Sequence, residues 1–332
     1  MTQTVMEIRD VGLEFRLPRS LADLARNRPG RVVKALNGVS LELKKGETLG
    51  VVGESGCGKS TLARCIVRLY APQHGSIRFD GQDIFTAAAK ADRSYNRRVQ
   101  MMFQDPYSSL NPRMTTGKIL AEALRVHKMR PEGGIEGRVA ELLDLVRLPQ
   151  DAAGKLPHEF SGGQRQRIAI ARALAVEPEV LIADELVSAL DVSVQAQVVN
   201  LLLELQERLN LTILFVAHDL RLVRHVSNRV AVIYLGRIVE IGDSETLFSS
   251  PSHPYSQALL SAAPSLDPDD KGDAIRLQGE LPSPLNVPPG CPFHVRCRHA
   301  TAFCKTKVPA LRPLPGRGEV ACHHAEEIIE NA

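Results

Sequence analysis

Residues 53–60, GESGCGKS, carry the residue types that bind phosphate groups. They fit the pattern G-x-x-x-x-G-K-[ST], after the strand-like run TLGVV and before the helix-like run TLARCIVRL. Glycines let backbone N–H groups converge on phosphate oxygens, and a helix N-terminus adds partial positive charge. Lys59 can reach the β- and γ-phosphates, and the Ser60 hydroxyl can ligate Mg²⁺. The sequence therefore predicts a nucleotide site made of Gly53, Glu54, Ser55, Gly56, Cys57, Gly58, Lys59, Ser60 and Thr61.

A second anion site is indicated at residues 160–167, FSGGQRQR. Ser161, followed by two glycines and a helical run, predicts a capped helix N-terminus with free N–H groups. From these residues alone, an ordinary capped helix explains the segment equally well.

The segment VLIADE, residues 180–185, brings two adjacent carboxylates to the end of an apolar strand. Because successive strand residues point in opposite directions, Asp184 and Glu185 are expected to have different roles. Asp184 suits Mg²⁺, directly or through water, and Glu185 suits polarising a water for in-line attack on a γ-phosphate. An apolar strand that ends in acids is also a common structural feature.

The elements that must position these residues alternate between strand and helix, as in an α/β domain. Strands are expected at residues 5–15, 46–53, 179–184 and 211–217, and helices at residues 163–176 and 193–209. The pair Asp80-Gly81 between two short β runs predicts a hairpin. We therefore expect one nucleotide-binding domain over residues 1–245.

Length and composition limit the other possibilities. A chain of 332 residues is expected to form one large domain and a smaller appendage. A net charge of +3, the absence of Trp and 4% aromatic residues argue against a nucleic-acid binder. No apolar signal core and no run near the ~20 residues of a spanning helix is present, so a cytosolic protein is expected.

Taken in order, the motifs resemble those of the ATPases of the ABC family. They are GESGCGKST, Gln104 in MMFQDP, FSGGQRQR, VLIADE, SALD at Ser188–Asp191, and His218 in FVAHD. The resemblance implies an α/β P-loop ABC ATPase cassette with a helical subdomain at about residues 105–165. It also implies that the chain hydrolyses ATP with Mg²⁺.

The same resemblance assigns roles to further residues. Gln104 would contact Mg²⁺ and the attacking water, and His218 would hold the γ-phosphate. Phe15 would stack on adenine; a plain core position is the alternative for this residue. The signature and interface residues would act on a nucleotide bound to the opposite subunit, head to tail; these are Ser161, Gly162, Gly163, Gln164 and Asp191.

One departure from the family pattern lies beside the catalytic carboxylate. Leu186 stands where the family usually has Pro, and loss of that restriction is expected to loosen the turn and slow hydrolysis. All the groups that do chemistry are present, so an active ATPase is expected.

Outside the cassette the chain is similar to the dipeptide/oligopeptide importer ATPases, above all to the second ATPase of dipeptide permeases. The likeness is carried by DPYSSLNPR, SALDVSVQAQ, YLGRIVE, HPYSQALLSAAP and GELPSPLNVPPGCPF. It implies a second ABC ATPase as partner in a heterodimer, two membrane-spanning permease subunits and an extracytoplasmic solute-binding protein. The chain would be peripheral, on the cytoplasmic face of the plasma membrane. Nickel, glutathione or an oligosaccharide as solute, or a cassette ATPase outside transport, are the alternatives.

Residues 246–332 are expected to be loop-rich, because 12 of the 21 prolines lie after residue 250. The resemblance implies that they form an importer-type C-terminal domain. Cys291, Cys297, Cys304 and Cys322 have the spacing C-x5-C-x6-C-x17-C. In a cytosolic chain such clustering points to metal more than to disulfides, and four thiols favour Fe–S or zinc. The same positions in the importer ATPases resemble a [4Fe–4S] site, which is preferred here to zinc or free thiols.

Overall fold

The computed structural model describes residues 3–19, 30–103, 109–188, 190–261 and 279–330. The chain divides into two compact units that alternate along the sequence. The first unit comprises Met1–Thr4, Leu43–Thr48 and Asp83–Ala217, and the second comprises Val5–Glu42, Leu49–Gln82 and His218–Ala332. The domain boundary predicted between residues 245 and 246 stays a prediction.

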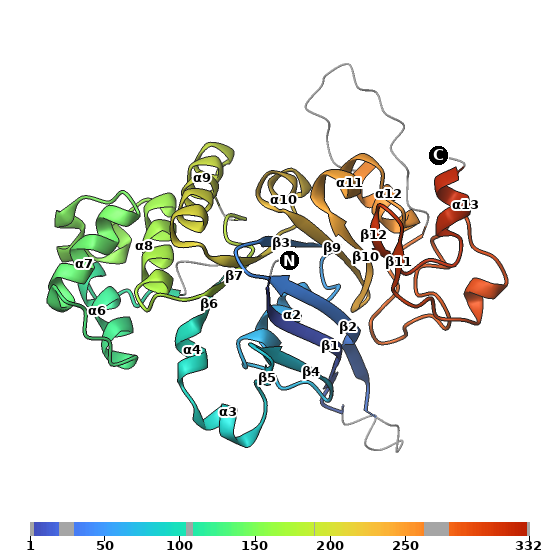
Figure 1. Cartoon of the computed structure of the whole chain (residues 1–332), viewed down its shortest axis with the longest axis horizontal. Helices are drawn as coiled ribbons and strands as arrows, with labels where there is room; N and C mark the ends of the chain where they lie inside the picture. The colour runs from blue at the N-terminus through green and yellow to red at the C-terminus, as the bar shows by residue number, and fades with distance from the viewer. Residues whose placement is uncertain (1–2, 20–29, 104–108, 189, 262–278, 331–332) are drawn as a thin grey trace. The chain divides into compact units, whose positions relative to one another are not determined.

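The first unit is built on parallel strands with helices around them (Figure 1). The strand β7 pairs with β6 on one side and with β8 on the other. Every residue of β7 and β8 is buried, as expected for parallel strands that are covered on both faces. The strands are β6 (Val99–Met102), β7 (Val180–Asp184) and β8 (Thr212–Val216).

Helices form the rest of the first unit. Among them α6, α7 and α8 pack together through fully buried leucines such as Leu120, Leu124 and Leu142. Both α6 and α7 fall within the span predicted for the helical subdomain. The helices are α3 (Ala87–Ala91), α4 (Ser94–Arg98), α6 (Thr116–Val126), α7 (Gly134–Leu145), η1 (Gln150–Gly154), η2 (Pro157–Glu159), α8 (Gly162–Leu174) and α9 (Val192–Leu209).

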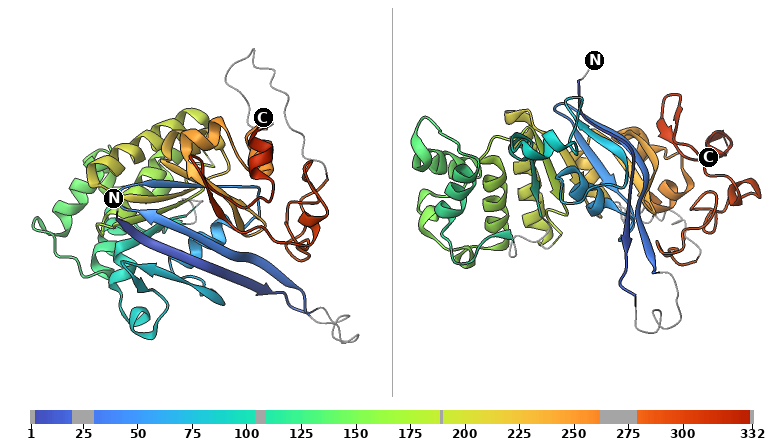
Figure 2. Two further views of the ribbon diagram at one scale, coloured as in Figure 1. Left: turned by 45° about the vertical axis from the view of Figure 1, so that its right-hand side comes forward. Right: turned by 90° about the horizontal axis from the view of Figure 1, so that it is seen from below.

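The second unit contains a sheet in the order β2-β1-β4-β5. The two long strands β1 and β2 run beside each other in both views of Figure 2. Asp80 and Gly81 have φ of 48° and 77° and join β4 to β5, which confirms the predicted hairpin. The strands are β1 (Thr4–Arg16), β2 (Val32–Lys44), β4 (His74–Phe79) and β5 (Gln82–Asp83).

A further group of strands in this unit leads from the phosphate-binding region to the C-terminal region. β3 and β9 are parallel, and β9, β10, β12 and β11 follow as antiparallel neighbours, with Pro313 on β11. The strands are β3 (Thr48–Val52), β9 (Arg229–Tyr234), β10 (Arg237–Asp243), β11 (Arg312–Leu314) and β12 (Gly318–Val320). The helices are α2 (Lys59–Ile66), α10 (Leu220–Val226), α11 (Ser244–Ser249), α12 (Pro254–Ser261), η3 (Phe303–Lys305) and α13 (Ala325–Glu330).

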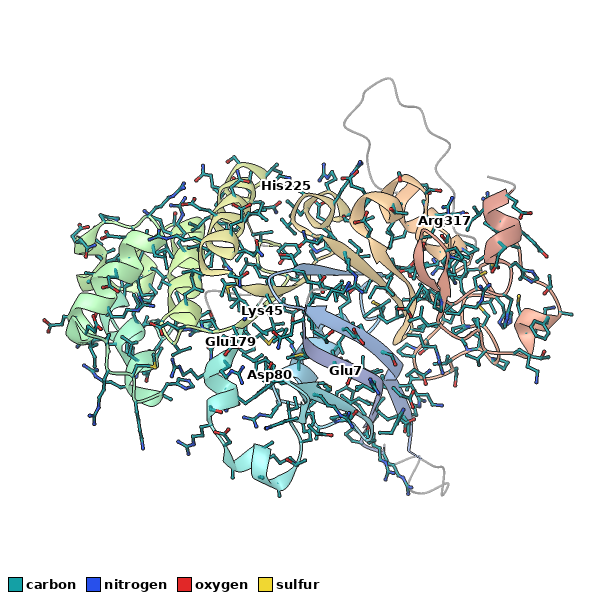
Figure 3. The ribbon with its side chains drawn as sticks, in the orientation of Figure 1. Glu7, Lys45, Asp80, Glu179, His225 and Arg317 are labelled. Atoms are coloured by element: carbon teal, nitrogen blue, oxygen red, sulfur yellow. The ribbon has the colours of Figure 1, made fainter. Side chains whose placement is uncertain are left out.

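The C-terminal region is anchored to β10 by one buried carboxylate. Glu240 is 2% exposed and accepts hydrogen bonds from the backbone N–H of Ser252 (2.7 Å) and of His253 (3.0 Å), just before α12 begins. Arg317, labelled in Figure 3, donates to the carbonyl oxygen (2.8 Å) and the hydroxyl (2.6 Å) of Ser250. Polar contacts to β10 and within the C-terminal region therefore fix this proline-rich segment.

Apolar packing adds to this anchorage. The ring of Tyr234 lies 4.7 Å from that of Tyr255 and 5.3 Å from that of Phe293, centroid to centroid. A smaller cluster joins Leu314, Val320 and Ala325, with Cys322 and Ile329 against it. The short strands and helices of this region thus share a small core of their own.

Candidate nucleotide site

The predicted phosphate loop, residues 53–60, joins β3 to α2 in the second unit. Gly53, Gly56 and Gly58 have φ of 152°, 78° and 111°, which L side chains rarely adopt. A Cβ on Gly53 would lie 2.2 Å from the carbonyl oxygen of Ile233, so this position also needs glycine for space. The strand–loop–helix arrangement expected from the sequence is confirmed.

Lys59 places its charge inside this loop. Its side-chain amine donates to the carbonyl oxygens of Gly53 (2.8 Å) and Glu54 (3.1 Å), and the residue is 5% exposed. The Cys57 thiol lies 3.8 Å from the Lys59 amine and is buried. Burial raises the pKa of Cys57, so the thiol stays neutral and fills space in the loop. The cation and the N-terminus of α2 together suit a triphosphate.

The predicted signature lies at the start of α8 in the first unit. The Ser161 hydroxyl accepts the Gln164 N–H at 3.4 Å, and the Gln164 side chain accepts the Ser161 N–H at 3.0 Å. This capping box confirms the expected helix cap. A Cβ on Gly163 would lie 2.4 Å from the Val194 side chain, so glycine lets α8 approach α9 closely.

Asp191 caps α9 and is exposed. Its carboxylate accepts from the Ser193 hydroxyl (2.7 Å) and from the Val194 N–H (3.0 Å). The hydrogen bond from Ser193 lowers the pKa of Asp191 most, and the bond from Val194 lowers it further. The residue is therefore a carboxylate at neutral pH.

The two acids at the end of β7, Asp184 and Glu185, differ more than strand alternation predicts. Asp184 is the last residue of the strand and is 3% exposed. Glu185 has left the strand with φ of 50°, and its N–H donates to the Val216 carbonyl oxygen at 2.8 Å. Such a φ is uncommon for a residue with a side chain and is frequent at functional sites. No residue type at this position predicts such a conformation.

The remaining predicted residues are placed as follows. His218 is exposed in the second unit, two residues after the end of β8 and just before Asp219, which caps α10. Phe15 is half-buried, and its ring meets that of Tyr70 edge-on at 5.2 Å. Gln104 lies outside the described residues.

The described residues do not show the predicted [4Fe–4S] site in a metal-binding arrangement. Within the described ranges, no group of three or more His, Cys, Asp or Glu residues is arranged to hold a metal ion. The cysteines there are free thiols, and burial raises the pKa of Cys291 to about 11 and that of Cys322 to about 12.

Sequence reasoning missed two residues that contact the phosphate loop. Arg296 pairs with the carboxylate of Glu54, and the Tyr255 hydroxyl accepts the N–H of Glu54. No local pattern links residues about 200 positions apart, so only the fold could reveal these contacts.

None of the helices in the described part of the chain has the length and apolar character that crossing a lipid bilayer demands.

Comparison with known proteins gives two family matches and two related cassette structures. The ABC transporter family matches residues 36–188, and the family described as the C-terminal region of oligopeptide/dipeptide transporters matches residues 239–304. The chain is similar to cbiO1 from Clostridium perfringens, with a TM-score of 0.63 and 28% identity over 74% of this chain and 91% of that one. It is also similar to the ATP-binding cassette MJ0796, with a TM-score of 0.62 and 27% identity over 72% and 98%.

Curated relatives match nearly the whole chain. The oligopeptide transport ATP-binding protein AppF of Bacillus subtilis is 51% identical over 97% of both chains. The di/tripeptide transport ATP-binding protein DppF of Pseudomonas aeruginosa is 47% identical over 98% of this chain and 99% of its own. With these matches added to the geometry of the phosphate loop, the chain belongs to the ATP-hydrolysing, ATP-binding proteins of oligopeptide/dipeptide ABC transporters.

Proposed function

We propose that residues 53–60 bind the triphosphate of ATP and that this chain uses the hydrolysis of ATP to drive solute import. The observation that carries the proposal is the phosphate loop itself, with its positive φ at three glycines and the Lys59 amine enclosed by its carbonyl groups. The loop leads directly into α2, whose N-terminus adds partial positive charge.

The two acids at the end of β7, Asp184 and Glu185, take part in the hydrolysis of ATP. Ser60, Asp184 and Gln104 would hold Mg²⁺, which neutralises phosphate charge when bound. Asp184 is buried at the strand end, which suits a fixed metal ligand, whereas Glu185 turns out of the strand, which suits contact with a water. Glu185 would orient that water for attack on the γ-phosphate, and His218 would hold the phosphate.

The site is completed by another cassette. Ser161 and Gln164 hydrogen-bond to each other in a capping box at the N-terminus of α8. This box orders the helix end, whose partial positive charge can attract an anion. We propose that this end closes on the nucleotide of a second ATPase, head to tail, and that Asp191 lines the interface. The related cassette MJ0796 is described as a dimer bound to ADP and Pi, which supports such pairing.

The cargo is proposed from the relatives. Those named for oligopeptide and di/tripeptide transport match nearly full length, which favours peptides over nickel, glutathione or an oligosaccharide and favours transport over other cassette functions. The proposed partners are a second, different ATPase, two permease subunits and an extracytoplasmic solute-binding protein. The chain would lie on the cytoplasmic face of the membrane.

The substitution Glu185→Gln tests the hydrolytic assignment. It keeps the size and polarity of the side chain but removes the base, so turnover should fall about 10²- to 10³-fold while MgATP affinity is retained. Steady-state ATPase rates and nucleotide titration of the assembled transporter measure both quantities. Undiminished hydrolysis would refute the role of Glu185.

We also propose that Cys291, Cys297, Cys304 and Cys322 ligate an iron–sulfur cluster. Support comes from the donor set, because four thiols suit a soft metal site. The Cys291 N–H donates to the Cys304 carbonyl oxygen at 2.8 Å. The Thr301 hydroxyl lies 3.5 Å from the Cys304 sulfur and 3.1 Å from the His324 ring, and the His324 N–H donates to the Cys322 sulfur at 3.4 Å. These contacts keep three of the four residues in one neighbourhood.

A further inference from the structure

The phosphate loop is bonded to the C-terminal region through the side chain of one of its own residues. One guanidinium nitrogen of Arg296, Nη1, donates to both carboxylate oxygens of Glu54, at 3.0 and 3.1 Å. The Arg296 side chain is 8% exposed and that of Glu54 is 23% exposed. The pair is therefore largely shielded from water, unlike an ordinary surface ion pair.

The backbone of Glu54 is held from the same region. Its N–H donates to the Tyr255 hydroxyl at 2.9 Å, and Tyr255 is fully buried. Rings pack around this tyrosine, with Tyr234 at 4.7 Å and Phe293 at 5.5 Å between centroids. The backbone N–H and the side-chain carboxylate of Glu54 are thus both held by residues more than 200 positions later in the chain.

The charge of Glu54 makes this contact relevant to nucleotide binding. Glu54 sits second in a loop that has to accept a polyanion, and Lys59 bonds to the carbonyl oxygen of the same residue. An unpaired carboxylate there would repel a triphosphate and compete for the Lys59 amine. Arg296 supplies the opposing charge.

We propose that Arg296 is a positioning residue for nucleotide binding, which neutralises Glu54 and so lets residues 53–60 accept a triphosphate. The segment Cys291–Cys304, which carries Arg296, then sets the affinity of the loop for ATP. A displacement of that segment weakens nucleotide binding through the loss of the Arg296–Glu54 pair. The proposal rests on the proposed function, because it takes residues 53–60 as the phosphate site.

The test is MgATP binding by the full chain, with Arg296→Gln, Glu54→Gln and the double variant compared with the original protein. Arg296→Gln should raise the Kd about five- to tenfold, because it leaves the Glu54 carboxylate unopposed. The double variant should return to within about twofold of the original Kd, because no unopposed charge remains. Arg298→Gln is the matched control, since Arg298 is exposed on the same segment and its Nε donates to the ring of the neighbouring His299.

The ATPase reaction gives a second measurement. Arg296→Gln should raise the KM for ATP and leave kcat within about twofold, because Arg296 does not touch the reacting atoms. Arg296→Lys should keep the affinity within about twofold, since it retains the charge, and it replaces the glutamine variant if that one fails to fold.

Three results overturn the proposal. They are an unchanged Kd for Arg296→Gln, a double variant as weak as Arg296→Gln, and a loss for Arg298→Gln of the same size. These failures are separable from failure of the proposed function, in which the original chain does not bind MgATP or Lys59→Ala binds it equally well.

Discussion

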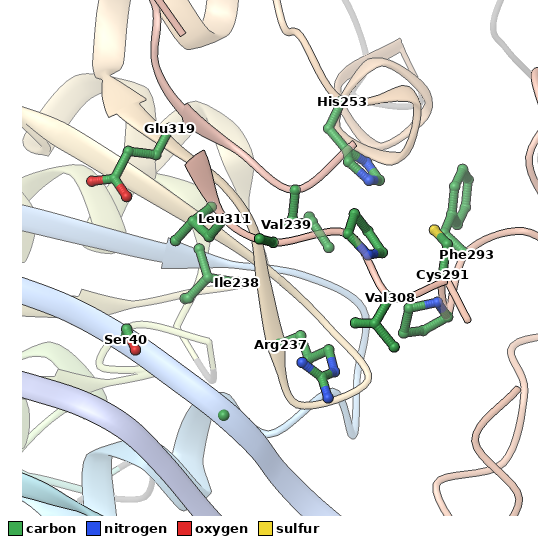
Figure 4. A pocket seen from close by; sticks show the side chains of 15 residues that line it. Ser40, Arg237, Ile238, Val239, His253, Cys291, Phe293, Val308, Leu311 and Glu319 are labelled. Carbon is green, nitrogen blue, oxygen red and sulfur yellow. The ribbon is translucent and has the colours of Figure 1, made fainter. Parts of the chain in front are cut away.

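His253 is buried in the protein, and its imidazole ring accepts a hydrogen bond. The residue is 1% exposed, and its Nδ1 accepts the Tyr255 N–H at 3.0 Å. Burial lowers its pKa to about 3. It lines a cavity of about 270 Å³ together with Arg237, Cys291 and Glu319 (Figure 4). The backbone N–H of His253 donates to the carboxyl group of Glu240, and burial raises the pKa of that carboxyl. The imidazole is therefore neutral in the folded protein.

This burial predicts a loss of stability in acid. Unfolding frees the ring to bind a proton below a pKa of about 6.5, so its contribution is complete above that pH and is lost as the pH falls towards 3. Between pH 6.5 and pH 5 the free energy of unfolding should fall by about 2 kcal/mol more for the original protein than for His253→Asn. Denaturant unfolding at several pH values measures this difference in the free energy of unfolding. Because both proteins contain Glu240, its contribution cancels when their pH profiles are compared. Parallel pH profiles would contradict the prediction.

At the scale of elements, the junction between β10 and α12 depends on the buried carboxylate of Glu240. Glu240→Ala leaves the N–H groups of Ser252 and His253 buried without their acceptor, and should lower the free energy of unfolding by about 2 kcal/mol. Glu319→Ala is a control on the neighbouring strand, where the side chain is exposed, and should change stability by less than about 0.5 kcal/mol. Chemical denaturation of the variants checks the difference, and equal losses would exclude the capping role.

Most of these elements could be predicted from local sequence. Short apolar runs predicted β3, β7 and β8 to within two residues at each end, because buried parallel strands leave an unbroken apolar signature. Ser161 before two glycines gave the cap of α8, and Asp80-Gly81 gave the hairpin. The positive φ of Glu185 could not be predicted, since no glycine or asparagine marks it and the surrounding fold imposes it.

At the scale of the whole molecule, the proposed cluster ties together residues spread over the C-terminal region. Anaerobically purified protein should contain about four iron atoms per chain and show a broad charge-transfer absorbance. Cys304→Ser should remove most of the iron, whereas Cys65→Ala, in the buried face of α2, should keep it. Zinc in place of iron, or neither metal, would contradict the cluster and leave the nucleotide site unaffected.

The parts of the site that escaped prediction are long-range contacts. The types and order of the motifs identified the phosphate loop, but Glu54 read as a variable position within it. Its partners Tyr255 and Arg296 come from the region whose prolines and cysteines indicated an independent appendage. Spacing along a sequence reports local geometry, and only tertiary packing shows which distant residues meet.

The outermost of the antiparallel strands in the second unit, β11, has a consequence for solubility. It is three residues long and has Pro313 at its centre, which has no N–H to offer to another chain. An exposed edge strand can pair with a strand of a neighbouring molecule, and such pairing starts aggregation. A short margin interrupted by proline is a poor template for such recruitment, so copies of this protein crowded together stay separate along that edge.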